Sequence, residues 1–192
     1  INSTTFGSHD YNASSVSEKL SLDCKESGST LRFLLPIVAA LGIETEFKLA
    51  GRLRERPMQQ LISQLENHGA NIDIGESGNI TISTSDSHIT PGAFNFANPE
   101  SSQYISGLLF ALPLLNGDSA IHVHNNLESS AYVVMTLAVL DKYGIKVNYM
   151  RNDREWIFNI PGNQKYSHSA PAPDPEGDWS NAAFLLALGA LG

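Results

Sequence analysis

Three segments rich in small hydroxyl residues stand directly before apolar runs that have the spacing of helices. These segments are Ser27–Thr30, Ser101–Gln103 and Ser129–Tyr132. A helix start presents unpaired backbone N–H groups and a partial positive charge, so it binds phosphate or carboxylate groups readily. Each segment can also be an ordinary helix cap that holds no ligand. Taken together, the three segments indicate a small anionic molecule as the candidate ligand.

An arginine-rich segment supplies the matching positive charge. Arginines alternate from Arg52 to Arg56, and alternating side chains lie on one side if the segment is extended. Pro57 predicts a helix start with proline at its first position, which places Arg56 at the positive end of the helix dipole. That arrangement is unfavourable without a bound anion, and a guanidinium holds phosphate or carboxylate through paired hydrogen bonds. The alternative is a set of surface ion pairs with neighbouring glutamates.

Three other features bear on catalysis and metal binding. Asp178, which ends the motif Glu176–Asp178 ahead of an apolar run, can act as an acid, a base or a ligand contact, or only as a helix cap. His122 and His124 alternate on a predicted strand, but no third ligand is evident, so no metal site is predicted. The single cysteine, Cys24, excludes an internal disulfide and is expected to be packed in the core. Neither a Walker loop nor a dinucleotide-binding glycine motif occurs in the sequence, and no cofactor is predicted.

The overall composition limits the classes of function. The chain has 192 residues, 42% of them hydrophobic and 17% charged, which is enough to bury a core. Its net charge of −8 argues against non-specific binding to nucleic acid or to membrane surfaces. The longest apolar runs, 33–43 and 107–115, are too short to cross a bilayer. The single cysteine and the lack of a signal peptide predict a cytoplasmic location, and Ile1 as the first residue suggests an excised piece.

Two stretches of the chain repeat each other. The first runs from Ser29 to Ile72 and the second from Ser101 to Val147, so the offset at the start is 101 − 29 = 72 residues. The predicted elements of the first copy are helix 29–41, strand 45–50, helix 57–69 and strands 71–74 and 79–83. Those of the second copy are strand 92–97, helix 101–115 with a proline in its last turn, strand 119–123, helix 129–143 and strands 145–149 and 156–160. We therefore predict an α/β (α+β) fold built from repeated β-α-β-α-β-β units.

The order of these motifs resembles one enzyme family. The motifs are Ser27–Arg32 (SGSTLR), Arg54–Met58 (RERPM), Ser101–Leu109 (SSQYISGLL), the Ser-x-x-Tyr of 129–132 and the EGD of 176–178. From about Leu22 to Gly192, the chain resembles the 5-enolpyruvylshikimate-3-phosphate synthases (3-phosphoshikimate 1-carboxyvinyltransferases). The resemblance implies an inside-out α/β barrel fold with two domains of three such units, whose helix N-termini face the cleft between the domains. The sister family, the UDP-N-acetylglucosamine enolpyruvyl transferases, shares this fold but is not expected to carry the SSQ helix start.

The resemblance also implies a domain organisation and a reaction. Residues 1–162 would be an incomplete shikimate-3-phosphate-binding domain, and residues 163–192 would be a crossover linker and the first helix of the second domain. The family transfers the enolpyruvyl group of phosphoenolpyruvate to the 5-hydroxyl of shikimate 3-phosphate, in aromatic amino-acid biosynthesis, without a cofactor or a metal. Because catalysis needs both halves of the cleft, this chain is expected to be inactive without its partner, the other domain. The full-length enzyme is expected to be a cytoplasmic monomer that binds neither nucleic acid nor membranes.

The resemblance assigns residue roles position by position. The residues expected to bind shikimate 3-phosphate are Ser101, Ser102, Gln103, Ser129 and Tyr132. Those expected to bind phosphoenolpyruvate are Gly28, Ser29, Arg56 and Gln103, and Arg56 would also bind the inhibitor glyphosate. Gln103, near the reacting centre, and Asp178 are the expected catalytic residues. Arg32 matches a family arginine within the helix, for which a structural role is expected.

Two residues depart from the family pattern. Glu26 stands where many members have asparagine, and a carboxylate near an anion site weakens anion binding unless it turns away or is paired. Phe33 replaces a frequent proline, so sensitivity to the inhibitor is not predicted. Three alternatives stay open: a UDP-N-acetylglucosamine enolpyruvyl transferase, a non-catalytic module that binds small anions, and a structural repeat domain without a ligand.

Overall fold

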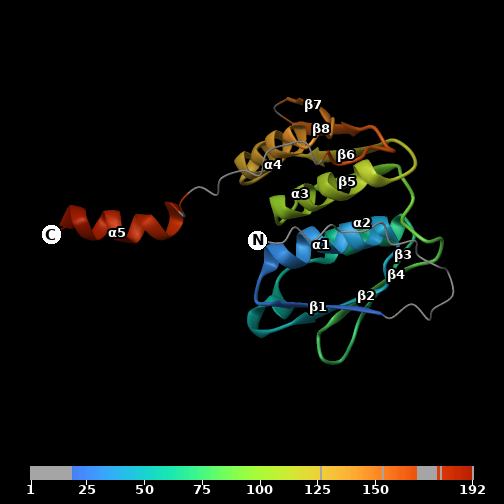
Figure 1. Ribbon diagram of the computed structural model, residues 1–192, viewed down its shortest axis with the longest axis horizontal. Helices are drawn as coiled ribbons and strands as arrows, with labels where there is room; N and C mark the ends of the chain where they lie inside the picture. The colour runs from blue at the N-terminus through green and yellow to red at the C-terminus, as the bar shows by residue number, and fades with distance from the viewer. Residues whose placement is uncertain (1–18, 126, 153, 168–176, 178, 192) are drawn as a thin grey trace, which may run out of the picture.

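Each half of the chain forms a four-stranded sheet with two helices against one of its faces (Figure 1). The computed structural model describes residues 19–125, 127–152, 154–167, 177 and 179–191. The elements of the first half are β1 (Leu20–Lys25), α1 (Gly28–Leu41), β2 (Thr45–Leu49), the short 3-10 helix η1 (Gly51–Glu55), α2 (Gln59–Asn67), β3 (Ala70–Ile74) and β4 (Ile80–Thr84). Those of the second half are β5 (Ala93–Ala97), α3 (Ser102–Ala111), the 3-10 helix η2 (Leu112–Leu114), β6 (Ser119–His124), α4 (Ser130–Lys142), β7 (Asn148–Arg151) and β8 (Glu155–Ile160). A further helix, α5 (Trp179–Leu191), follows the second half.

The two halves share one topology. The strand order is β1-β2-β4-β3 in the first sheet and β5-β6-β8-β7 in the second. In each sheet the first two strands are parallel, and the other neighbouring strands are antiparallel. The parallel pair needs a crossover connection, which α1 and α3 provide. The predicted repeat of β-α-β-α-β-β units is therefore confirmed.

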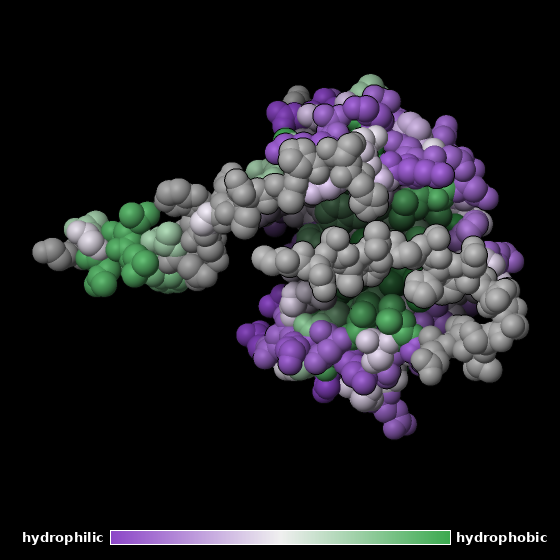
Figure 2. Space-filling view, viewed as in Figure 1, coloured by the Kyte–Doolittle hydropathy of each residue, from purple (hydrophilic) through white to green (hydrophobic). Residues whose placement is uncertain are grey.

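The helices α1 to α4 lie between the two sheets, which form the outer layers (Figure 1). Strand residues alternate between burial and exposure, as in β5, where Phe94 and Phe96 are buried and Asn95 is exposed. The same alternation buries Phe47 and Leu49 in β2. Hydrophobic residues accordingly gather between two polar outer surfaces (Figure 2). Contact between the two units is thus made chiefly through their helices.

The backbones of α1 and α3 approach closely at one point. A Cβ added to Gly107 of α3 would lie 2.2 Å from the carbonyl oxygen of Arg32 and 3.2 Å from Cγ of Pro36, both in α1. In an α-helix, the N–H of residue 36 would donate to the carbonyl oxygen of residue 32. Residue 36 is a proline and has no N–H, so this hydrogen bond is not formed. Glycine in one helix and proline in the other therefore let the units pack backbone to backbone. This contact holds the start of α1 beside the start of α3.

The segment between β2 and α2 differs from the prediction. Residues 51–55 form the 3-10 helix η1, so the next α-helix begins at Gln59 and not at Pro57. The alternating arginines do not lie on one side. A 3-10 helix has three residues per turn, whereas side chains two residues apart share a side only in an extended segment. Arg54 turns back and donates from Nε and Nη2 to the carbonyl oxygen of Leu49 (3.0 and 2.7 Å). Arg56 is extended, with φ −73° and ψ 138°, and it alone of the segment's arginines lines the site described below.

Most other boundaries agree with the prediction to within a few residues. Gly42 ends α1 in the left-handed region at φ 65°, and the turn that contains Pro113 ends α3. β7 begins at Asn148 rather than at residue 145, because the N–H of Ile145 donates to the carbonyl oxygen of Leu140 (3.0 Å) at the end of α4. Cys24 is 2% exposed, and burial raises the pKa of its thiol, with a smaller contribution from Asp23. Among the described residues, no helix is long and apolar enough to cross a membrane.

Candidate functional site

A pocket of about 710 Å³ lies where the N-terminal ends of α1, α3 and α4 meet, and residues of both repeat units line it. Its volume is typical of a small-molecule site. The lining residues from the first unit are Ser29, Arg32, Phe33 and Arg56. Those from the second unit are Glu100, Ser101, Ser102, Gln103, Ser106, Phe110, Glu128, Ser129, Tyr132, Met135, Thr136 and Val139. The three hydroxyl-rich helix starts that the sequence singled out therefore meet at one place.

The start of α1 is open to charged side chains because its first residue is glycine. The hydroxyl of Ser27 caps the helix by accepting from the N–H of Thr30 (3.2 Å). A Cβ added to Gly28 would lie 2.8 Å from Nη1 of Arg56 and 3.5 Å from Nη1 of Arg32. These two nitrogens are thus no more than about 6 Å apart, the sum of the two distances. Two positive charges at that separation repel by roughly 1 to 3 kcal/mol in a partly solvated site, and a bound anion relieves the repulsion.

The polar residues at the start of α3 serve different purposes. Ser101 is the N-cap, and its hydroxyl accepts from the N–H of Gln103 (3.2 Å). Ser102 occupies the first turn, is 8% exposed and lines the pocket. The side chain of Gln103 reaches across to α1, where its Oε1 accepts from Nη1 of Arg32 (3.0 Å). The start of α3 therefore presents two hydroxyls, an amide and the N–H groups of the first turn.

The start of α4 differs from the expected helix cap. Ser129 lies in the left-handed region, at φ 54° and ψ 33°, and its side chain makes no capping hydrogen bond. Ser129 thus occupies the N-cap position, but the alternative that its side chain is an ordinary helix cap is wrong. Tyr132, one turn later, is 62% exposed and lines the same pocket. Backbone strain of this kind gathers at binding sites, where the surrounding structure holds it in place.

Arg32 is buried beneath these helix starts, with 8% of its surface exposed. Its guanidinium lies 5.3 Å from the ring centre of Tyr104, and Nη2 donates to the carbonyl oxygen of Pro57 (2.9 Å). Burial raises the pKa of Tyr104 to about 12, against an opposing contribution from Arg32 and with a supporting one from Glu100. The phenol therefore stays protonated at neutral pH and donates to the same Pro57 carbonyl. These contacts connect the α3 start to the segment that carries Arg56.

Sequence reasoning missed several residues of the pocket. Glu100 and Glu128 line it. Each directly precedes a serine that was predicted to bind the ligand, and this adjacency in the sequence could have identified them. Phe33 and Phe110 meet edge to face, with ring centres 5.5 Å apart, and form an apolar wall. This wall could not be read from either helix alone, because it requires the crossing of α1 with α3.

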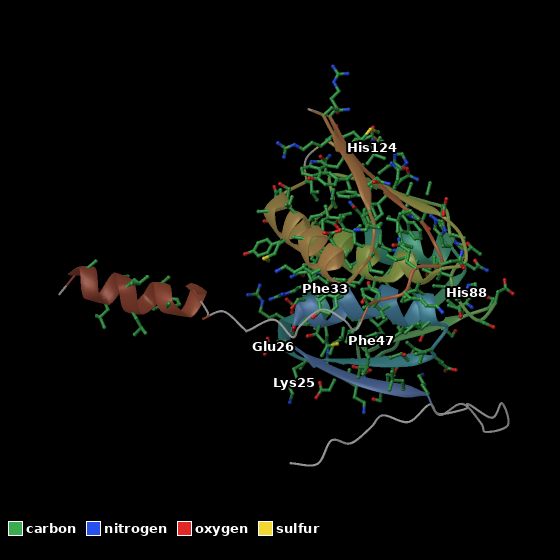
Figure 3. All side chains as sticks on the ribbon, turned by 45° about the horizontal axis from the view of Figure 1, so that its top comes forward. Lys25, Glu26, Phe33, Phe47, His88 and His124 are labelled. Carbon is green, nitrogen blue, oxygen red and sulfur yellow. The ribbon has the colours of Figure 1, made fainter. Side chains whose placement is uncertain are left out.

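Glu26 does not line the pocket. A Cβ added to Gly51 would lie 2.5 Å from Oε2 of Glu26, so this carboxylate rests against η1. It borders a separate hollow together with Arg52, Glu55, Arg56 and Pro57. Figure 3 shows Glu26 near the start of α1 on the side of β1, while Phe33 lies on the opposite side of α1. The carboxylate that departs from the family pattern therefore lies outside the pocket, although its hollow shares Arg56 with the pocket.

The remaining candidates lie elsewhere. His122 and His124 each place Nδ1 near Oε1 of Glu155 (3.2 and 3.3 Å), and His124 and Glu155 border a different hollow. Within the described ranges, no group of three or more His, Cys, Asp or Glu residues is arranged to hold a metal ion. Gly28 packs behind Arg56 and not on the pocket wall. Asp178 lies outside the described residues, so its role stays a prediction.

The sequence and the fold both match known proteins. The sequence model of EPSP synthase (3-phosphoshikimate 1-carboxyvinyltransferase) matches residues 2–192. The 3-phosphoshikimate 1-carboxyvinyltransferase of Clostridium novyi is 40% identical over 175 residues, which are 91% of this chain and 39% of the relative. That of Brachyspira hyodysenteriae is 41% identical over 175 residues, which are 91% of this chain and 40% of the relative. The chain thus spans about 40% of the length of these curated relatives.

A solved structure shares the fold. EPSP synthase from Acinetobacter baumannii superposes with a TM-score of 0.60 at 21% sequence identity. The match covers 77% of this chain and 32% of that one. The fold class predicted from the repeat and from the motifs is therefore confirmed.

Proposed function

Because the chain belongs to the EPSP synthase family, we propose that it forms part of the active site of a 3-phosphoshikimate 1-carboxyvinyltransferase. Such an enzyme transfers the enolpyruvyl group of phosphoenolpyruvate to the 5-hydroxyl of shikimate 3-phosphate. One observation carries the proposal. The residues expected to contact the two substrates come from three helix starts and one loop, and seven of them line a single pocket: Ser29, Arg56, Ser101, Ser102, Gln103, Ser129 and Tyr132.

The starts of α3 and α4 form the proposed subsite for the 3-phosphate. Hydroxyls of Ser101, Ser102 and Ser129 donate to phosphate oxygens there, together with backbone N–H groups of the first turns. These donors are neutral, and the dipoles of both helices add partial positive charge. Tyr132, which is largely exposed, packs against the ring of the substrate.

Phosphoenolpyruvate binds on the side of α1 in this proposal. Arg56 holds its phosphate, Ser29 contacts it at the helix start, and Gly28 leaves room for the Arg56 guanidinium. Gln103 lies between the two subsites, so its amide can donate to a substrate oxygen near the reacting carbon. Donors that are fixed before the reaction stabilise charge as it develops in the transition state.

Comparison of the two repeat units indicates that one face of α4 lacks the unit that would pack against it. In the first unit, α2 docks on the following unit: Gln64 Oε1 accepts from the N–H of Asn95 (2.8 Å), and Gln60 Nε2 donates to the carbonyl oxygen of Ala97 (3.4 Å). The offset at the end of the repeat is 144 − 69 = 75 residues, so Met135 and Val139 of α4 are the equivalents of these glutamines. They are 57% and 42% exposed. We propose that a third unit of the same kind covers this face in a complete domain.

The proposed domain boundaries follow from this arrangement. Residues 1–162 belong to the shikimate-3-phosphate-binding domain, and residues 163–192 form the crossover and the first helix of the second domain. The helix α5 supports this division, because Phe184, Leu185, Leu186 and Leu188 are between 62% and 76% exposed and need a further core to cover them. Figure 2 shows hydrophobic surface, coloured green, along α5. A cytoplasmic location and a monomeric full-length enzyme are parts of the same proposal.

Calorimetric titration of the chain with shikimate 3-phosphate tests the proposal. Shikimate 3-phosphate is expected to bind at least about 30-fold more tightly than shikimate, because charge-assisted hydrogen bonds to a phosphate contribute about 1.5 to 3 kcal/mol each. Turnover is not expected from the chain alone, and phosphate release from phosphoenolpyruvate should appear only when the rest of the enzyme is supplied.

The outcomes separate the alternatives. Tighter binding of UDP-N-acetylglucosamine than of shikimate 3-phosphate would assign the chain to the sister activity. Binding of shikimate 3-phosphate without phosphate release after the missing part is supplied would indicate a non-catalytic anion-binding module. Binding of none of these ligands would leave only a structural repeat and would refute the proposed function.

A further inference from the structure

We propose that Arg32 is a positioning residue, which orients the side-chain amide of Gln103 and ties it to the segment that carries Arg56. This inference rests on the proposed function, because it concerns how the two proposed subsites are held together. Arg32 is itself 8% exposed, and its polar atoms contact groups of both repeat units. The contacts with Gln103 and Pro57 carry the argument, because they come from different nitrogens of one planar group.

The first contact decides which way the amide of Gln103 faces. Nη1 of Arg32 lies 3.0 Å from Oε1 of Gln103. A guanidinium has five N–H donors and no acceptor, so only the carbonyl end of an amide can face it favourably. The NH2 group of Gln103 must then point along the other branch of the planar amide, away from Arg32. Arg32 thereby turns Gln103 into a donor toward the ligand, which is the polarity that an anion requires.

The second contact, with Pro57, holds the backbone next to Arg56 in place. Nη2 of Arg32 donates to the carbonyl oxygen of Pro57 (2.9 Å), and Nε lies 3.4 Å from Sδ of Met58. The hydroxyl of Tyr104, whose ring lies under the guanidinium, donates to the same carbonyl. Pro57 directly follows Arg56, so a shift of Arg32 moves both Gln103 and the backbone of the proposed phosphoenolpyruvate subsite.

Packing fixes the base of the Arg32 side chain. Its own carbonyl oxygen lies against Gly107, where even a methyl group would approach to 2.2 Å. The side chain therefore starts from a rigid point, and its planar fork reaches Gln103 and Pro57 at once. Lysine keeps the positive charge but is a single point donor, so it cannot hold both partners in one plane.

Nuclear magnetic resonance of the side-chain amides tests this inference without a ligand. In the unmodified chain, the Gln103 amide is expected to be as ordered as that of Gln164, whose side chain contacts Lys146 and Pro161 (2.6 to 2.9 Å). An order parameter of about 0.8 is expected for both. A value below about 0.6 is expected for the amide of Gln59, whose contact with the Ser63 hydroxyl (3.2 Å) is exposed to solvent. In the variant Arg32→Lys, Gln103 should fall to the level of Gln59 while Gln164 stays unchanged. A general loosening of the fold would lower Gln164 as well.

A double-mutant cycle then tests the effect on binding. Arg32→Lys is expected to weaken binding of shikimate 3-phosphate about 10-fold, but less than about 3-fold when Gln103→Ala is already present. Arg52→Lys, at a side chain that is 89% exposed, is the matched control and should change nothing. Additive effects, or an equally ordered Gln103 amide in Arg32→Lys, would overturn the inference. If the unmodified chain binds no shikimate 3-phosphate, the proposed function fails, and the order parameters alone decide the role of Arg32.

Discussion

Replacing Gly107 by alanine is expected to lower the free energy of unfolding by about 2 to 4 kcal/mol. The new methyl group would lie 2.2 Å from the carbonyl oxygen of Arg32 and 3.2 Å from Cγ of Pro36. Neither neighbour can move easily, because one is helix backbone and the other is a ring in the same helix. Alanine favours the helical state by about 1 kcal/mol relative to glycine, so the clash must exceed that gain. Urea unfolding followed by circular dichroism measures the difference.

The matched control is Gly75→Ala in the turn between β3 and β4. A Cβ at this position meets nothing closer than 3.9 Å, and the backbone there is not left-handed. The free energy of unfolding of Gly75→Ala should be unchanged or up to about 1 kcal/mol higher, because alanine lowers the conformational entropy of the unfolded chain. Equal stability of Gly107→Ala and the unmodified chain would mean that α1 and α3 are not packed backbone to backbone as described.

Replacing Ser101 by aspartate is expected to abolish phosphate binding while leaving the fold intact. Aspartate is as good an N-cap as serine, so it can accept from the N–H of Gln103 as Ser101 does (3.2 Å). It also places a negative charge at the positive end of α3 and near Nη1 of Arg32, which is 3.5 Å from the present hydroxyl. A bound phosphate would face that charge at close range, at a cost of about 1 to 4 kcal/mol, and would lose a donor. A loss of affinity of about 100-fold or more follows, and calorimetry with shikimate 3-phosphate measures it.

Ser77→Asp is the control for the change of charge. The hydroxyl of Ser77 also accepts from a backbone N–H two residues later, that of Asn79 (3.4 Å), but in an exposed turn away from the helix starts. The same substitution there should leave binding within about 2-fold of that of the unmodified chain, because solvent and salt screen the added charge. Similar losses in the two variants would show that net charge, and not the α3 start, governs binding.

The elements of the fold could be predicted because their signals are local. The apolar spacing of α1 and the glycine at residue 42 define a helix and its end, and both appear where expected. The convergence of Ser29, Ser101 and Ser129 was also predictable. Two units of one topology that pack through the equivalent helices α1 and α3 bring Ser29 and Ser101 together, and Ser129 joins them because α4 packs beside α3.

The features that escaped prediction depend on contacts between distant segments. The 3-10 turn that redirects Arg54 is held by the carbonyl group of Leu49, which has no signature in the arginine spacing. Arg32 was assigned only a structural role, because the sequence does not reveal that Gln103 lies beside it. The placement of Glu26 outside the pocket likewise depends on Gly51, whose missing side chain leaves room for the carboxylate.

A map of backbone amide shifts during titration with shikimate 3-phosphate examines the convergence of the helix starts most directly. The largest changes are expected together at Ser102 and Gln103 of α3 and at Ser129 before α4, with smaller ones at Ser29. These residues belong to separate helix starts but line one pocket. Chemical-shift changes confined to one helix start, or centred on His122 and His124 of β6, would contradict a shared anion site at the junction of the two units.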